Sequence, residues 1–130
     1  MTPQVGFVVF LVVTVALLGA VVFTGVKARI RAHIPLVVLT AAALGVTIYF
    51  AEKLGELYDL ASAGAITPVH LTLAKIATAS YVLPIVTGAL TLRDRSRRRV
   101  HLVCALITLA LTVATAITGA WMLLASTPKA

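Results

Sequence analysis

Four long apolar runs constrain the fold of this chain more than any other feature. They cover about residues 5–26, 34–51, 69–92 and 100–125. A helix needs roughly 20 apolar residues to cross the hydrocarbon core of a bilayer, and each run meets or nearly meets that length. Of the 130 residues, 61% are hydrophobic and 12% are charged, which leaves too few charges for the surface of a water-soluble domain.

Transmembrane strands would show alternating polarity in pieces of about 10 residues, and the sequence has no such alternation. The sequence therefore predicts an all-α integral membrane protein, in contact with the lipid bilayer. We expect residues 1–130 to form one four-helix transmembrane bundle. Its helices are predicted at about 5–26, 33–52, 69–92 and 100–125, with Pro84 a candidate kink in the third.

The basic residues predict how the chain lies in the membrane. Eight of the eleven Lys and Arg residues fall in two short connections, 27–31 and 93–99. The third connection, 52–68, carries a net charge of −2. The positive-inside rule then places both basic connections in the cytoplasm and both termini outside, in a multi-pass protein of the cell (inner) membrane. The net charge of +7 is therefore interpreted as a topology signal. The two basic turns have no interleaved aromatic residues, so the sequence does not predict a nucleic-acid partner.

Two similar halves are visible in the sequence. The motifs KARIRAH (27–33) and RSRRRVH (95–101) each place a histidine at the start of an apolar helix, after a cluster of positive charge. Each motif follows a helix that begins with Thr-Pro and carries Thr-Gly near its end. We therefore expect two helical hairpins of one design, related by an axis along the membrane normal.

The paired histidines, His33 and His101, are the strongest candidate site. Threonines follow each of them at seven and fourteen residues, about two and four helical turns, so that each histidine shares a helix face with two threonines. Facing helices of a bundle commonly hold a cofactor, and a haem iron takes one imidazole from each side. We expect a b haem there, with Thr40 and Thr108 leaving room for the macrocycle. An arginine guanidinium can form two hydrogen bonds to a carboxylate, so we expect arginines to bind the haem propionates. The candidates for this role are Arg29, Arg31 and Arg98.

A simpler interpretation of the same residues stays open. Histidines at the ends of membrane helices often lie among lipid head groups, and threonines are ordinary packing residues of membrane helices. Cys104, the single cysteine, cannot form an internal disulfide and is interpreted as a small packing residue.

A second group of polar residues is expected at the outer side. Glu52 ends the second helix and His70 opens the third, so that the two could bind a divalent metal ion or a second cofactor. Two ligands are few for a metal site, and exposed carboxylates are usually only solvated. The identity of any second metal stays unknown.

The order of the motifs resembles a known family. The chain has a basic turn with His33, then Thr47-Ile48-Tyr49-Phe50, Pro68-Val69-His70-Leu71, Leu83-Pro84, a second basic turn with His101, and Thr118-Gly119 before Met122-Leu123. This order is similar to a four-helix, multi-histidine family of bacterial and archaeal membrane proteins, domain-of-unknown-function family 420, over about residues 20 to 125.

Members of that family are associated with haem–copper oxidase and haem biosynthesis genes, so the resemblance implies redox or respiratory-chain work. The family pattern has histidines at the positions of His33, His70 and His101 and a fourth near the outer end of the second helix. This chain has Glu52 and Lys53 there. The chain is also similar to small b-type cytochromes, in which paired membrane helices supply axial histidines.

Together these features predict a b-type cytochrome-like membrane protein that transfers electrons through a haem held by His33 and His101. Such a protein would pass electrons to a quinone or a respiratory complex, alone or as an oxidoreductase subunit, and would function as a homo- or hetero-oligomer. The alternative is a cofactor-free accessory or assembly subunit of a respiratory or other membrane complex. Neither a serine–histidine–carboxylate arrangement nor a phosphate-binding glycine motif is present to suggest other chemistry.

Overall fold

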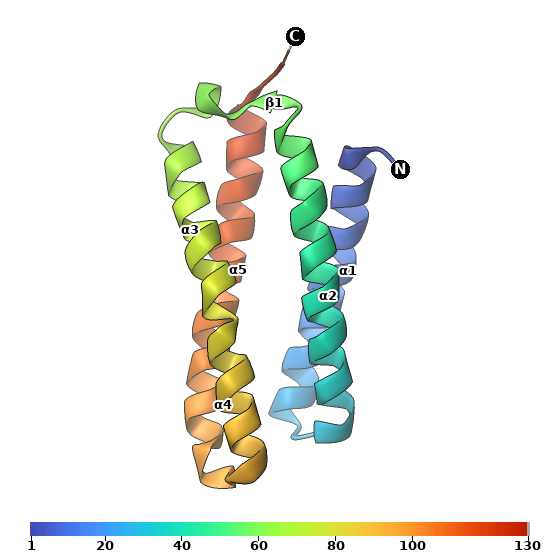
Figure 1. The fold of residues 1–130 in the computed structure, drawn as a ribbon, viewed down its shortest axis with the longest axis vertical. Helices are drawn as coiled ribbons and strands as arrows, with labels where there is room; N and C mark the ends of the chain where they lie inside the picture. The colour runs from blue at the N-terminus through green and yellow to red at the C-terminus, as the bar shows by residue number, and fades with distance from the viewer. Residues whose placement is uncertain (130) are drawn as a thin grey trace. The chain divides into compact units, whose positions relative to one another are not determined.

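The computed structural model describes residues 1–129 and is almost entirely helical (Figure 1). Four segments of it are long and apolar enough to cross a membrane, which confirms the predicted all-helical fold with four membrane-length segments. The helices are α1 (Pro3–Val26), α2 (Ile30–Gly55), α3 (Ile66–Ser80), α4 (Val82–Arg93) and α5 (Arg98–Ala125). The short elements are β1 (Tyr58–Asp59), η1 (Leu60–Ala63), η2 (Arg95–Arg97) and β2 (Thr127–Pro128).

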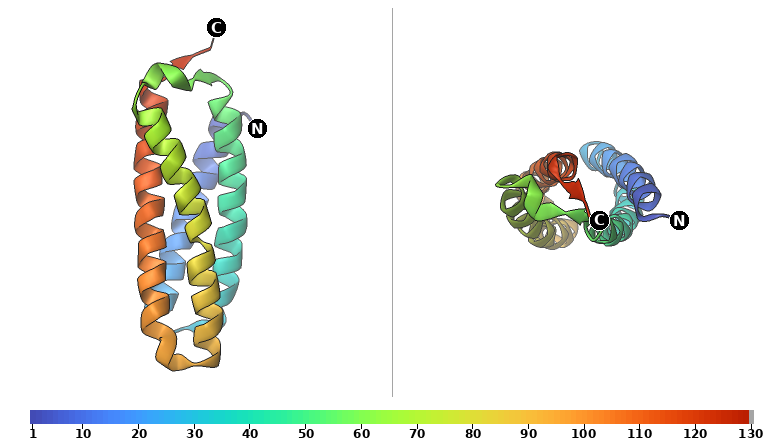
Figure 2. Two further views of the ribbon diagram at one scale, coloured as in Figure 1. Left: turned by 60° about the vertical axis from the view of Figure 1, so that its left-hand side comes forward. Right: turned by 90° about the horizontal axis from the view of Figure 1, so that it is seen from above.

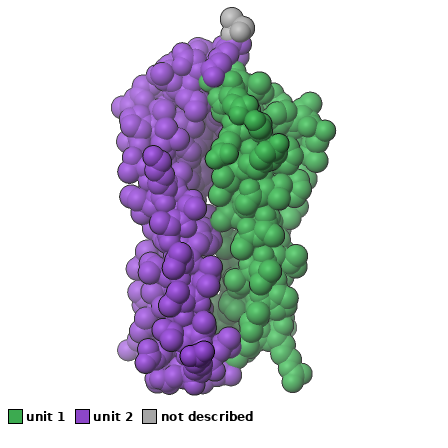
Figure 3. All heavy atoms as spheres, viewed as in Figure 1, with its two compact units in different colours: residues 1–58 green, residues 59–130 purple. Residues whose placement is uncertain are grey.

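The chain divides into two compact units, residues 1–58 and residues 59–130 (Figure 3). Unit 1 is the antiparallel pair α1 and α2, joined by a short turn in which Ala28 takes a left-handed backbone conformation with φ of 52°. Unit 2 packs α3 and α4 in succession against α5, as the two views of Figure 2 also show. Each unit thus corresponds to one of the two predicted hairpins, and the assembly of both into one domain stays a prediction.

The distribution of side chains suits a lipid environment. Large aliphatic residues point outward: Val12, Val38 and Ile117 are all more than 60% exposed. The buried positions are instead mostly small or hydroxyl-bearing, namely Thr14, Thr24, Thr40, Ala43, Thr47, Ala77, Ser80 and Thr108, with the larger Leu54 and Met122. Small residues let membrane helices approach closely, and hydroxyl groups form hydrogen bonds between them. We use the term seam for the buried face along which the helices of one unit pack.

The third membrane segment is interrupted near Pro84. Helix α3 ends at Ser80 and α4 begins at Val82, because the Pro84 ring has no N–H to donate and clashes with the carbonyl four residues earlier, that of Ser80. The hydroxyl of Thr108 on α5 donates a hydrogen bond of 3.0 Å to that Ser80 carbonyl. The Ser80 carbonyl therefore has a partner on α5, and the helix is interrupted within one turn of Pro84, where the sequence predicts a kink.

The connections are held by local hydrogen bonds. In the basic connection between α4 and α5, the Asp94 carboxylate accepts hydrogen bonds from the Ser96 hydroxyl (2.7 Å), the Ser96 amide (3.0 Å) and Arg97 Nε (3.4 Å). These bonds, the Ser96 ones above all, hold the pKa of Asp94 below its ordinary value. At the other end of unit 2, the Thr127 amide donates to the Ser62 hydroxyl (2.9 Å), where β2 pairs with β1.

Candidate functional site

All three histidines of the chain lie in the same local environment. Each imidazole packs against a Thr-Gly dipeptide on the neighbouring helix of its own unit. We call this arrangement a Thr–Gly–His module. The modules are Thr24–Gly25–His33 in unit 1, and Thr87–Gly88–His101 and Thr118–Gly119–His70 in unit 2.

In unit 1, the module joins the end of α1 to the start of α2. His33 Nδ1 lies 3.1 Å from the Thr24 hydroxyl oxygen and 3.1 Å from the Val21 carbonyl oxygen. A carbonyl oxygen can only accept a hydrogen bond, so that Nδ1 of His33 must carry the proton. The lone pair of the neutral ring is then on Nε2.

In unit 2, the two modules are reciprocal. His101 of α5 packs on α4, with Nδ1 3.2 Å from the Thr87 hydroxyl oxygen. His70 of α3 packs on α5, with Nδ1 3.2 Å from the Thr118 hydroxyl oxygen, and the Thr115 carbonyl also accepts a hydrogen bond from this ring. Each side of the hairpin thus contributes one histidine and one Thr-Gly dipeptide.

The threonines decide the direction of these hydrogen bonds. Each threonine hydroxyl donates its single proton to the carbonyl four residues earlier in its own helix: Thr24 to Ala20 (2.8 Å), Thr87 to Leu83 (2.7 Å) and Thr118 to Ala114 (2.9 Å). The hydroxyl oxygen is then an acceptor toward the histidine, and Nδ1 is the donor. All three modules therefore favour one tautomer, with the lone pair on Nε2.

The glycines give the rings their space. A Cβ atom built on Gly25 would lie 3.1 Å from His33 Cε1, and one built on Gly88 would lie 3.2 Å from His101 Cε1. Gly119 is tighter, because a Cβ there would lie 2.8 Å from His70 Cε1. Each imidazole is thus held between a hydroxyl group and the bare backbone of a glycine, which fixes the orientation of the ring.

The three predicted arginine partners lie at the basic ends of the hairpins. Arg29 precedes His33 by four residues, about one helical turn, and Arg98 precedes His101 by three residues. Both arginines are exposed, as is Arg31. The Arg29 guanidinium also lies over the Phe23 ring, 5.7 Å from its centroid.

The two predicted threonines lie inside the seams. Thr40 is 5% exposed and donates to the Leu36 carbonyl, while Thr108 is 4% exposed and donates to Ser80. Further along the seam of unit 1, the hydroxyl oxygens of Thr14 and Thr47 are 2.9 Å apart. The threonine spacing therefore marks the face along which each hairpin closes.

The predicted outer residues belong to different units, Glu52 to α2 of unit 1 and His70 to α3 of unit 2. Within residues 1–129, no three side chains of His, Cys, Asp and Glu gather where they could hold a metal ion. The neighbouring Lys53 forms an exposed ion pair of 2.9 Å with Glu56. A metal shared by Glu52 and His70 stays a prediction.

The end of unit 1 opposite its basic connection has an apolar contact in place of a Thr–Gly–His module. There the Phe50 ring of α2 packs directly on Gly6 of α1, in the space that a Cβ would need. The Phe10 ring stacks on Phe50 with centroids 5.7 Å apart. The two hairpins are thus alike at their basic ends and different at the opposite ends.

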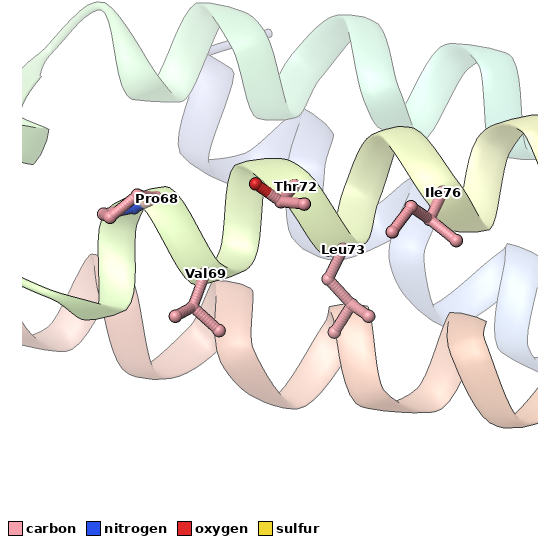
Figure 4. A pocket seen from close by; sticks show the side chains of 5 residues that line it. All are labelled: Pro68, Val69, Thr72, Leu73 and Ile76. Carbon is pink, nitrogen blue, oxygen red and sulfur yellow. The ribbon is translucent and has the colours of Figure 1, made fainter.

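A surface groove of about 450 Å³ follows α3 and is separate from the modules (Figure 4). Its lining residues are Pro68, Val69, Thr72, Leu73 and Ile76. They all belong to one helix and offer a single hydroxyl group, so the groove provides no donor set for a metal or a haem iron.

The threonine–glycine half of each module was not part of the predicted site. Its signal was present in the sequence, since Thr-Gly occurs at 24–25, 87–88 and 118–119, as often as histidine itself. Only the antiparallel pairing of the helices reveals that each dipeptide meets one imidazole.

Comparison of the chain with protein-family models, curated proteins and solved structures finds no match.

Proposed function

We propose that the protein is a membrane b-type cytochrome in which His33 and His101 are the axial ligands of one haem. Each unit supplies one imidazole, from the first turn or two of the helix that follows a basic connection. When bound, the haem iron changes between its ferric and ferrous states and so carries single electrons.

The observation that carries the proposal is the hydrogen bonding of the two Nδ1 atoms. A histidine that binds a metal through Nε2 usually donates its other N–H to a carbonyl or another acceptor, which fixes the tautomer and orients the ring. His33 has this arrangement with Thr24 and the Val21 carbonyl, and His101 has it with Thr87. The Nδ1 hydrogen bonds of both rings thus support ligation through Nε2.

The surroundings of the two rings fit a haem in other respects. The exposed side chains of the helices are apolar, as the macrocycle requires. Arg29 and Arg98, about one turn before their histidines, are the proposed partners of the propionate carboxylates, with Arg31 as a further candidate. Thr40 and Thr108 contribute indirectly, because their buried hydroxyls close the seams that carry the histidines.

The absorption spectrum of the purified protein in detergent tests the proposal. The protein is expressed with ample haem, then oxidised in air and reduced with dithionite. Two imidazole ligands are expected to give a low-spin spectrum, with a Soret band that sharpens and shifts on reduction and split visible bands. If neither the oxidised nor the reduced protein shows haem bands, the proposal is contradicted.

A cofactor-free accessory or assembly subunit is the second candidate. It is favoured by the fact that each histidine hydrogen bond also joins two helices, so the modules could serve packing alone. A featureless spectrum would select this function. In either case the partner is a respiratory or other membrane complex, and for the cytochrome a quinone is a further candidate.

For topology, we propose that the basic connections lie in the cytoplasm and that both termini lie outside the cell membrane. The support is the placement of Lys27, Arg29 and Arg31 in the first connection, and of five arginines between 93 and 99 in the other. Reporter fusions to the two termini are expected to show periplasmic alkaline phosphatase activity, and a fusion within 60–65 is expected to show the same. If a fluorescent protein joined to either terminus fluoresced in the cytoplasm, the proposed orientation would be contradicted.

A further inference from the structure

We propose that the connection between α4 and α5, residues 93–99, is a binding site for an anionic phospholipid with two phosphate groups, such as cardiolipin. The inference is independent of the haem, because it uses neither a histidine nor the arginines assigned to the propionates. It rests on three features of the connection, namely its excess of positive charge, its internal hydrogen bonds and the apolar side chains beside it.

The connection has a large excess of positive charge. Five arginines and one aspartate lie within residues 93–99, so that the net charge is +4. The chain has only four acidic residues, and the other three lie within 52–59. Every side chain from 93 to 99 is exposed. The phosphate of an ordinary phospholipid carries a single negative charge, so a lipid with two phosphates matches this connection better than a lipid with one.

The one acidic group of the connection is occupied by its neighbours. Asp94 Oδ1 accepts hydrogen bonds from the amide and the hydroxyl of Ser96, and Oδ2 accepts one of 3.4 Å from Arg97 Nε. The Arg97 amide also donates to the Asp94 carbonyl, at 3.2 Å. These bonds fix the course of the backbone and pair Asp94 with Arg97, so that the carboxylate neutralises this arginine and not the others.

Three further arginines have their positive charge available for an external anion. Arg93 ends α4, Arg95 lies in η2 and Arg99 lies in the first turn of α5. None of the three forms an ion pair within residues 1–129. A guanidinium group can form two parallel hydrogen bonds to a phosphate and is more weakly hydrated than an ammonium group. The connection therefore offers phosphate donors from three successive elements.

The apolar side chains beside the arginines identify the anion as a lipid. Leu92, directly before the connection, is 54% exposed, and Val100, directly after it, is 56% exposed. Leu90 and Val103, further along α4 and α5, are exposed as well. A phospholipid places its acyl chains against such apolar surface while its phosphates meet the basic residues at the helix ends. A free phosphate or a nucleic acid has no group that would cover these side chains.

Quenching of tryptophan fluorescence by brominated lipids tests the site in the intact protein. The reporter protein carries Trp121→Phe, which removes the single natural tryptophan, and Leu92→Trp, which introduces one directly before Arg93. It is reconstituted in phosphatidylcholine vesicles that contain brominated cardiolipin, phosphatidylglycerol or phosphatidylcholine. Cardiolipin is expected to bind at least about tenfold more strongly than phosphatidylcholine, with phosphatidylglycerol between the two.

The test variant combines Arg93→Gln and Arg95→Gln in the reporter protein. A basic residue near an anionic membrane surface contributes a factor of about five to binding, so we expect the preference for cardiolipin to fall about fivefold or more. The matched control combines Lys27→Gln and Arg31→Gln, which remove the same number of charges from the connection of unit 1, and it should keep the preference. Equal quenching by the three lipids, or an equal loss of preference in both double variants, overturns the proposal.

Two further measurements separate lipid binding from free phosphate binding and from a folding defect. Sodium phosphate and sodium chloride at equal ionic strength should reduce the quenching by cardiolipin equally. Displacement by phosphate alone would indicate a site for free phosphate and would refute the lipid. Mass spectrometry of the unsubstituted protein, released from neutral detergent with equimolar cardiolipin and phosphatidylcholine, needs no variant. The bound lipid is expected to be mostly cardiolipin, and an even mixture contradicts the proposal.

Discussion

Replacement of either His33 or His101 by alanine is expected to remove the low-spin haem spectrum. The remaining imidazole would hold the iron from one side only, which does not give a six-coordinate centre. Loss of a partner that merely supports a ligand reduces metal affinity about 10–100-fold, so that loss of the ligand itself should cost more than about tenfold. The measurement is the reduced-minus-oxidised difference spectrum, normalised to protein.

Two controls separate ligation from packing. His70→Ala should retain the low-spin bands, since its module lies about 25 Å away from that of His101 along α5. Thr24→Val keeps the imidazole but removes one acceptor of Nδ1, and it should weaken haem binding less than His33→Ala does. If all three histidine variants kept the low-spin haem equally well, the assignment of His33 and His101 would be refuted.

Substitution of Gly6 by alanine is expected to destabilise unit 1 by about 1–3 kcal/mol, the usual cost of overpacking a close-packed interior. The new methyl group would overlap the Phe50 ring, since a Cβ there lies 2.7 Å from Cζ and closer still to other ring atoms. Phe50 cannot simply turn aside, because it stacks on Phe10. The overlap must therefore push α1 and α2 apart at the end opposite the basic connection.

The stability of the variant can be measured by titration with sodium dodecyl sulfate, followed by energy transfer between labels on the first and second helices. Gly19→Ala is the matched control on the same helix, because a Cβ at Gly19 meets nothing within 4 Å. This control should unfold at the same detergent fraction as the wild type or slightly later. Equal midpoints for Gly6→Ala and Gly19→Ala would refute the close contact with Phe50.

The sequence predicted the helices well, because their length and apolar character are set by the bilayer. The predicted bounds lie within about three residues of the observed ones, apart from the interruption at Tyr81. The cause of the interruption, Pro84, was visible in the sequence. The sequence did not show which group would bond to the freed Ser80 carbonyl, because that group is the hydroxyl of Thr108, 28 residues away on another helix.

The candidate site was predicted only in part. The histidines and the threonines were correctly placed on shared helix faces, but periodicity does not say what a face packs against. Thr40 and Thr108 pack into the seams, where their hydroxyls bond to carbonyl groups. The repeated Thr-Gly dipeptide was visible in the sequence, but the importance of Gly25, Gly88 and Gly119 depends on an imidazole ring from a different helix.

The closure of each seam within its own unit has a consequence for the biogenesis of the protein. A hydroxyl or imidazole group that enters lipid unpaired is costly. Here the hydroxyls of Thr14 and Thr47 satisfy each other, and His33 finds its acceptors on α1, which is synthesised just before it. A ribosome that delivers the chain hairpin by hairpin would therefore release α1 and α2 into the bilayer already paired, before α3 emerges.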